Sequence, residues 1–119
     1  MDEILMRNCI FCKIVDQEVP ATILYENDNV LAFRDIRPQA PIHVLIIPKR
    51  HIATLNDVSA KDSSLIAEMI QVAHDLAAAE GIEKNGYRLV INCNQNGGQE
   101  VYHIHLHLLG GRQMKWPPG

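Results

Sequence analysis

The segment 103–108 alternates histidine with aliphatic residues and holds three of the six histidines of the chain. Successive side chains of a β-strand point to opposite faces of a sheet. A strand through this segment would place His103, His105 and His107 on one face and aliphatic side chains on the other. The alternation therefore predicts a strand with one polar and one apolar face.

Three histidines in a row indicate chemistry rather than packing. A single histidine on a core strand is usually a hydrogen-bonded core residue, but imidazole is costly to desolvate and titrates near pH 6.5. The outer two would lie about 13 Å apart at Cα, whereas nitrogens that share a metal ion each lie about 2.0–2.1 Å from it. All three therefore do not easily share one ion, and His105, flanked on both sides, suits a nucleophile or base.

The rest of the chain predicts one α+β domain over residues 1–119, the length of a single domain. Apolar residues recur every three or four positions between Leu65 and Ala77, Ser59 with Asp62 resembles a capping box, and Gly81 is a fitting stop. The expected elements are a short helix at 9–16, a hairpin of strands at 22–26 and 30–34, a strand at 43–48, a long helix at 60–80, a strand at 87–92, and the histidine strand. They give about five antiparallel strands with one long and one short helix.

Composition narrows the classes of function. A net charge of -3 and a pI near 6.0, with no clustered basic face, argue against binding of polymeric nucleic acid. No apolar run approaches the roughly 20 residues of a membrane span and no signal-peptide pattern is present, so we expect no membrane partner and a cytoplasmic protein. Three cysteines fit reduced thiols or a metal site better than a disulfide framework.

Several further stretches resemble one known family. They are Ala32-Phe33-Arg34-Asp35-Ile36, Pro38-Gln39-Ala40-Pro41, the run from His43 to Lys49, Gly97-Gly98-Gln99, and the ending from Gly110 to Gly119. Together with the His-apolar-His-apolar-His-apolar-apolar run at 103–109, they resemble the Hint branch of the histidine-triad (HIT) nucleotide hydrolases and transferases. The resemblance implies a HIT-like fold and a homodimer whose apolar C-terminal segment lies at the interface.

The resemblance also implies an activity, hydrolysis of the P–N bond in phosphoramidates of purine nucleotides, AMP or GMP derivatives. In that mechanism His105 attacks phosphorus, which leaves a nucleotidyl-histidine intermediate that water opens. His103 orients His105, while His107 and His43 contact the phosphate and assist proton transfer. No cofactor is required for this chemistry.

The resemblance to the family also implies which residues contact the substrate. Asp35, which alone would be a turn or capping residue, binds ribose hydroxyls, since a carboxylate accepts from two donors at once. Asn92 contacts ribose or phosphate. The remaining expected contacts are Ile10, Phe11, Ile14, Phe33, Ile36, Gly98, Gln99, Glu100, Val101 and Trp116. Glu100 replaces the serine usual in eukaryotic members, so leaving-group selection is expected to differ.

The cysteine pair Cys9-x-x-Cys12 is a second departure from the eukaryotic pattern, and by itself it fits buried thiols as well as metal ligands. His51 and His103 match positions that bind zinc with such a pair in other histidine-triad proteins, and a closed structural site requires four ligands of this kind. We therefore predict a structural Zn²⁺ held by Cys9, Cys12, His51 and His103. The alternative is the metal-free Hint pattern with two free thiols.

Two other functions stay open. A dinucleoside polyphosphate hydrolase of the Fhit branch shares the triad but lacks the Trp-Pro-Pro-Gly ending. A nucleotide-binding scaffold would keep the fold with little turnover. No catalytic residue of the pattern is missing, which favours an enzyme.

Overall fold

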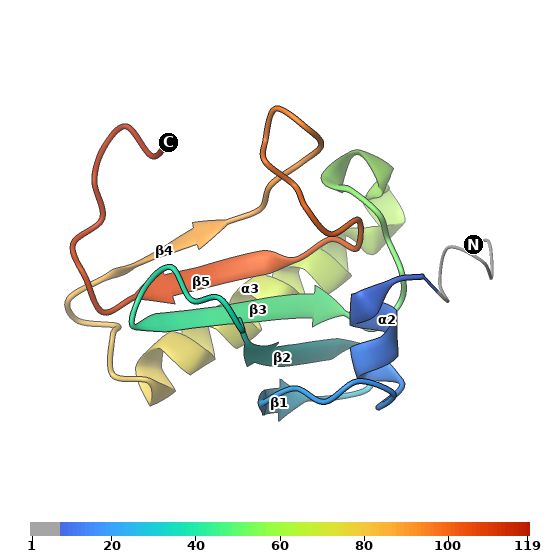
Figure 1. Ribbon diagram of the computed structural model, residues 1–119, viewed down its shortest axis with the longest axis horizontal. Coiled ribbons are helices and arrows are strands. Elements are labelled where there is room, and N and C mark those ends of the chain that lie inside the picture. The colour runs from blue at the N-terminus through green and yellow to red at the C-terminus, as the bar shows by residue number, and fades with distance from the viewer. Residues whose placement is uncertain (1–7) are drawn as a thin grey trace.

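Five antiparallel strands form one sheet in the order β1-β2-β3-β5-β4. The computed structural model describes residues 8–119. In chain order the elements are α2 (Ile10–Val15), β1 (Ile23–Glu26), β2 (Val30–Arg34), β3 (Ile42–Pro48), short 3₁₀ turns at Leu55–Asp57 and Ala60–Asp62, α3 (Ser63–Ala79), β4 (Tyr87–Val90) and β5 (Leu106–Gly110). The long helix α3 covers one face of the sheet, and α2 lies on the opposite face near one end of β2 and β3 (Figure 1). The predicted α+β architecture is confirmed.

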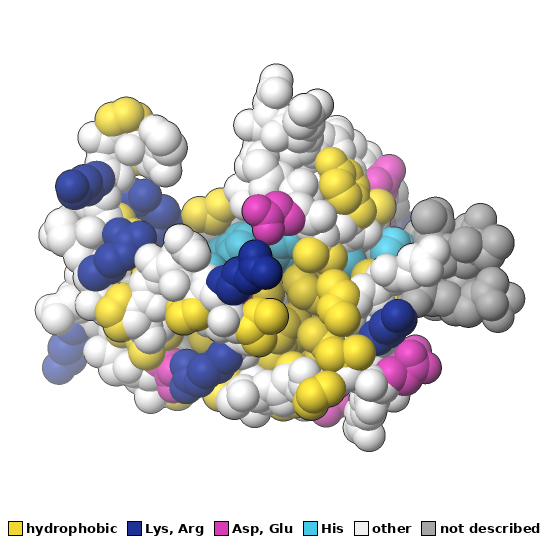
Figure 2. Space-filling model, viewed as in Figure 1, with side chains coloured by type: hydrophobic (Ala, Val, Ile, Leu, Met, Phe, Trp, Pro, Cys, Tyr) yellow, Lys and Arg dark blue, Asp and Glu magenta, His cyan; other side chains and the backbone are white. Residues whose placement is uncertain are grey.

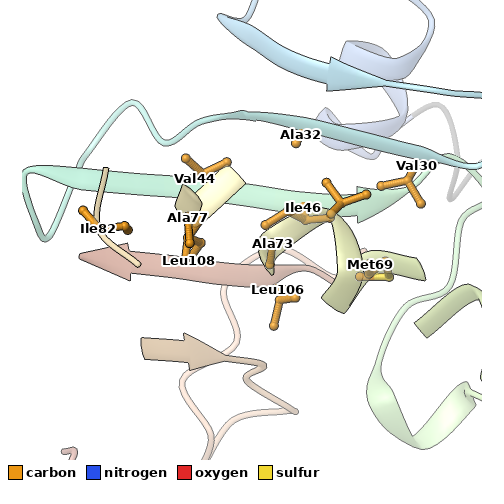
Figure 3. Close-up of a cluster of buried hydrophobic side chains, with 11 residues drawn as sticks. Val30, Ala32, Val44, Ile46, Met69, Ala73, Ala77, Ile82, Leu106 and Leu108 are labelled. Atoms are coloured by element: carbon orange, nitrogen blue, oxygen red, sulfur yellow. The ribbon is translucent and has the colours of Figure 1, made fainter. Parts of the chain in front are cut away.

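The inner strands β2 and β3 are buried on both faces, and the alternation of their side chains divides the core into two clusters. Against α3 pack Val30, Ala32, Val44, Ile46, Met69, Val72, Ala73, Ala77, Ile82, Leu106 and Leu108 (Figure 3). A smaller cluster on the α2 face contains Cys9, Phe11, Cys12, Leu31, Phe33, Leu45 and Ile47. Each fully buried large apolar side chain contributes about 1.5–3 kcal/mol. The sheet thus gives the side chains on its α2 face a closely packed support.

The long helix forms where the sequence predicts it, with a tighter first turn. The Ser59 amide and hydroxyl donate to the Asp62 carboxylate at 3.0 and 3.1 Å, so the capping box is present. A 3₁₀ turn occupies residues 60–62 and α3 begins at Ser63. Gly81 ends the helix at a φ of 75°, a left-handed conformation that costs glycine little. No helix within residues 8–119 is long and apolar enough to cross a membrane.

The histidine strand is shorter than the alternation predicts, because β5 begins only at Leu106. Ile46 pairs with Leu106, so continuing the ladder by two positions would set Ile104 opposite Pro48. Pro48 has no N–H to donate, and its carbonyl accepts instead from His103 Nε2 at 2.8 Å. Ile104 donates its own amide to the carbonyl of Ile52. The prediction of one strand through all three histidines is therefore wrong.

Candidate functional site

A cavity of about 660 Å³ opens on the α2 face of the sheet, at the histidines (Figure 2). Its wall is apolar toward α2 and polar toward β3 and β5. Most of the site residues expected from the sequence line it: Ile10, Phe11, Ile14, Phe33, Asp35, Ile36, His43, Asn92, Gly98, Glu100, Val101, His105 and His107. His103 does not line it, because its side chain is fully buried behind the wall.

His43 and His107 are diagonal neighbours on the two paired strands β3 and β5. His43 Nε2 lies 2.9 Å from His107 Nδ1, and the backbone amide of Gln39 donates to His43 Nδ1 at 3.0 Å. Because an amide can only donate, His43 Nδ1 carries no proton and neutral His43 holds its proton on Nε2. That proton points at His107 Nδ1, so the proton of neutral His107 sits on its Nε2. One backbone amide thereby fixes both tautomers.

The Nε2 atom of His107 is buried and has no hydrogen-bond partner within residues 8–119. Burial, with neighbouring His105 and His43, lowers the pKa of His107 to about 4. The ring is therefore neutral at pH 7 and presents an unpaired N–H beside the cavity. A buried donor without a partner costs about 1–3 kcal/mol, and an acceptor oxygen entering the cavity would relieve that cost.

His105 is held as a neutral base with a free lone pair. Its Nδ1 donates to the backbone carbonyl of His103 at 2.8 Å, so Nε2 is unprotonated. The ring packs edge-on against Phe11 and His107, with centroids 5.1 and 4.8 Å away. Burial lowers the pKa of His105, opposed by its hydrogen bond to His103 and by the charge of Asp35. The hydrogen bond that fixes the ring of His105 is thus accepted by the His103 carbonyl, while the His103 side chain faces the two cysteines.

Asp35 continues the alternation of β2 one step past the strand, on the same face as Phe33. Its Oδ1 accepts from the backbone amide of Arg37 at 2.7 Å, and Oδ2 lies 3.5 Å from His43 Nε2. The carboxylate lines the cavity with lone pairs left to accept further hydrogen bonds.

Two of the expected substrate contacts lie outside the cavity wall. Gln99 is buried, and its side-chain amide donates to the carbonyls of Ala53 and Val101 at 2.8 and 3.0 Å. Its side-chain oxygen accepts from Asn94, so Gln99 holds the glycine loop together. Trp116 is 82% exposed in the C-terminal segment and does not reach the cavity of its own chain. Conversely, the sequence did not identify Gln39 as a site residue. Gln39 acts through its backbone amide, which donates to His43, and residue type does not reveal such a contact.

Four candidate metal ligands converge behind the cavity, as the sequence predicts. The ligand atoms of Cys9, Cys12, His51 and His103 all lie within 4.8 Å of one another, and all four residues are buried. Cys9 Sγ lies 3.3 Å from His103 Nδ1, while Cys12 Sγ lies 3.3 Å from His51 Nδ1 and 3.5 Å from His103 Nδ1. His103 donates its Nε2 proton to Pro48, which leaves the Nδ1 lone pair facing the sulfurs.

These separations fit tetrahedral zinc. Ligands about 2.0–2.3 Å from Zn²⁺ stand roughly 3.3–3.8 Å apart along the edges of a tetrahedron. Burial raises the pKa of the Cys12 thiol to about 12 and lowers the pKa of His103 to about 4. A metal ion would therefore displace a thiol proton at Cys12 and find an imidazole already neutral at His103. A second group, Asp35, His43 and His107, is equally compact but is explained by its own hydrogen bonds.

Comparison with known proteins agrees with this geometry. A model of the HIT domain matches residues 16–114. The chain is 57% identical over 105 residues to the purine nucleoside phosphoramidase of Escherichia coli K12, covering 88% of each protein. A crystal structure of a HIT family hydrolase from Legionella pneumophila is 67% identical, with a TM-score of 0.93 over 94% of this chain and all of that one.

A zinc-bound histidine triad family protein from Mycobacterium smegmatis is 36% identical, with a TM-score of 0.79 over 90% of this chain and 77% of that chain. Fold, histidine geometry and sequence similarity thus lead to one assignment. The chain belongs to the HIT domain family.

Proposed function

We propose that the protein hydrolyses phosphoramidates of purine nucleoside 5'-monophosphates at the P–N bond. The observation that carries this proposal is the pair of fixed tautomers in the cavity, a bare Nε2 on His105 beside an unpaired N–H on His107. The name of the E. coli relative, purine nucleoside phosphoramidase, supports the choice of bond and substrate class.

The reaction divides into two displacements at phosphorus. His105 Nε2 attacks phosphorus, the P–N bond breaks, and the departing amine takes one proton from solvent as it leaves. Water then opens the nucleotidyl-histidine and returns one proton, so the histidines end as they began. His107 Nε2–H donates to a phosphoryl oxygen in both transition states, where negative charge develops. His43 contributes by holding the tautomer of His107.

The nucleoside fits the remaining walls of the cavity. Phe11, Ile14 and Phe33 offer an apolar slot for the base, and Asp35 offers its carboxylate to the ribose hydroxyls. The glycine loop approaches the phosphate closely, since Gly98 adopts a φ of 78° and carries no side chain. Asn92 and Val101 line the part of the cavity that we assign to the ribose and the phosphate.

The direct test is turnover of a fluorogenic adenosine 5'-phosphoramidate by the purified protein, with release of AMP followed by chromatography. Diadenosine tetraphosphate serves as the comparison substrate. Cleavage of the phosphoramidate alone supports the proposal. Preferential cleavage of the polyphosphate would favour a dinucleoside polyphosphate hydrolase, and binding of AMP without turnover of either would favour a scaffold.

Asp35→Ala is expected to weaken AMP binding by about 1.5–3 kcal/mol, the scale of hydrogen bonds to a charged group. Calorimetry with AMP and 2'-deoxy-AMP measures the effect, and the deoxynucleotide should lose less because it presents one hydroxyl fewer. Asp28→Ala, an exposed aspartate in the β1-β2 turn, is the matched control. Equal losses for the two nucleotides would contradict ribose recognition by Asp35.

We further propose that the Cys9, Cys12, His51 and His103 cluster binds one structural Zn²⁺. Its burial, its 3.3–3.5 Å ligand separations and the zinc-bound relative from M. smegmatis support this. When bound, the ion would tie α2 to the segment that leads into β5. No step of the proposed reaction passes through it.

A homodimer is proposed from the C-terminal segment. Trp116 is 82% exposed among Met114, Pro117 and Pro118, an apolar surface too large for a solvated tail. Burial against a second chain would cover it. Light scattering at micromolar concentration should give twice the chain mass of 13.4 kDa, and a monomeric mass would rule the dimer out. The cytoplasmic location stays a prediction from the sequence.

A further inference from the structure

Glu100 is an acidic wall residue whose charge is not offset by any hydrogen bond or ion pair within residues 8–119. The cavity has four charged wall residues, Arg34, Asp35, Arg37 and Glu100. Arg34 pairs with Glu80 at 2.7 Å, and Asp35 is engaged by the Arg37 amide and by His43. Glu100 is exposed and free to meet a ligand.

No cationic side chain within residues 8–119 forms an ion pair with Glu100. Burial lowers the pKa of His43 and His107, so these two imidazoles are neutral at pH 7. Arg37, in the loop after β2, also lines the cavity, but its side chain forms no ion pair with Glu100. Figure 2 shows the histidine surface recessed between an acidic and a basic side chain.

The direction of displacement brings the leaving group to the open side. His105 is only 7% exposed, and its ring packs on Phe11 at the bottom of the cavity. In an in-line displacement the departing nitrogen lies across phosphorus from the attacking Nε2. The amine therefore leaves outward, past the exposed residues of the rim, and Glu100 stands on the loop that leads into the histidine segment.

We propose that Glu100 selects the leaving group, favouring phosphoramidates whose amine carries a second, positively charged group, as a diamine does. This inference rests on the proposed phosphoramidase function and names its substrate class more narrowly. An exposed carboxylate attracts a nearby ammonium group and repels a carboxylate, and salt screens both effects. Anionic leaving groups, polyphosphates included, are disfavoured by the same charge.

The test uses three adenosine 5'-phosphoramidates of matched length, made from 1,3-diaminopropane, butylamine and β-alanine. Their kcat/KM values are measured at low ionic strength for the unaltered protein and for Glu100→Gln, an isosteric change that removes the charge. Taking the ratio between the two proteins cancels the intrinsic reactivity of each amine. We expect Glu100→Gln to lower the preference for the diamine over butylamine about three- to fivefold, the scale of an exposed ion pair, and to raise relative use of the β-alanine compound.

Glu83→Gln, which removes an exposed carboxylate outside the cavity wall, is the matched control and should leave all three ratios unchanged. Added salt should shrink the diamine preference of the unaltered protein toward that of Glu100→Gln. Identical ratios in Glu100→Gln and the unaltered protein, with turnover intact, would overturn the role of Glu100 and leave the phosphoramidase proposal standing. Absence of turnover with all three compounds would overturn both.

Discussion

His105→Ala is expected to lower kcat for an adenosine phosphoramidate by at least about a thousandfold, because it removes the nucleophile of the first displacement. AMP affinity should stay within a few-fold of the unaltered protein, since Asp35 and the apolar slot remain in place. Single-turnover kinetics and calorimetry on the same preparation separate the two effects. His74→Ala, on the exposed face of α3, is the control for loss of a histidine.

Chemical complementation sharpens this test. His105→Gly leaves space beside Phe11 for a free imidazole ring, so the imidazolide of AMP can occupy the position of the nucleotidyl-histidine. Hydrolysis of that imidazolide by the glycine variant, without cleavage of the amine compound, would identify His105 as the residue that carries the nucleotide. Residual phosphoramidate activity within tenfold of the unaltered protein would exclude His105 as the nucleophile.

The second large effect is expected from Cys9→Ser/Cys12→Ser, which should abolish zinc binding and lower the melting temperature by about 10 °C or more. The proposed ion would join Cys9, the N-cap of α2, and Cys12 within α2 to His51 and His103, and structural zinc sites contribute directly to folding free energy. A loss of about 3 kcal/mol produces a shift of this size in a domain of this length. Elemental analysis of protein purified without added metal or chelator, with calorimetry alongside, measures both quantities.

Cys93→Ser is the matched control, because Cys93 is a third free cysteine outside the cluster. It should retain about one zinc per chain and its melting temperature. If the unaltered protein takes up no zinc even after incubation with the ion under reducing conditions, the metal proposal fails. The assignment of His105 does not depend on that outcome.

Periodicity and capping chemistry were enough to predict the long helix. The apolar residues of α3 recur at helical spacing and its two ends carry local signals, at Ser59 with Asp62 and at Gly81. The start of β5 was mispredicted because alternation is a property of one segment, whereas a strand needs a partner. Pro48, on the neighbouring strand, cannot donate to Ile104, and nothing near the histidines reveals this.

In the candidate site, too, some groups could be predicted from the sequence and others could not. The side chains of the site, from Asp35 to the four clustered Cys and His residues, could be predicted from the resemblance to a family. Such a resemblance depends on residue type and on the order of residues, and both can be read from the sequence. The groups that set the tautomers are the backbone amide of Gln39 and the backbone carbonyl of His103. Every residue has a backbone carbonyl, and every residue except proline has a backbone N–H. Their role depends on where the fold brings them, so the sequence alone does not identify them.

The His107 Nε2–H has no hydrogen-bond partner within residues 8–119, so folding stability and the proposed catalysis make opposite demands on this atom. A ring without that donor would sit in the same space at lower free energy, because the desolvation cost of about 1–3 kcal/mol would vanish. Selection for heat resistance alone would therefore tend to erase the donor, and selection for turnover would keep it. On the proposed function, the stability forgone is of that size and is concentrated at the atom that would donate to a substrate oxygen.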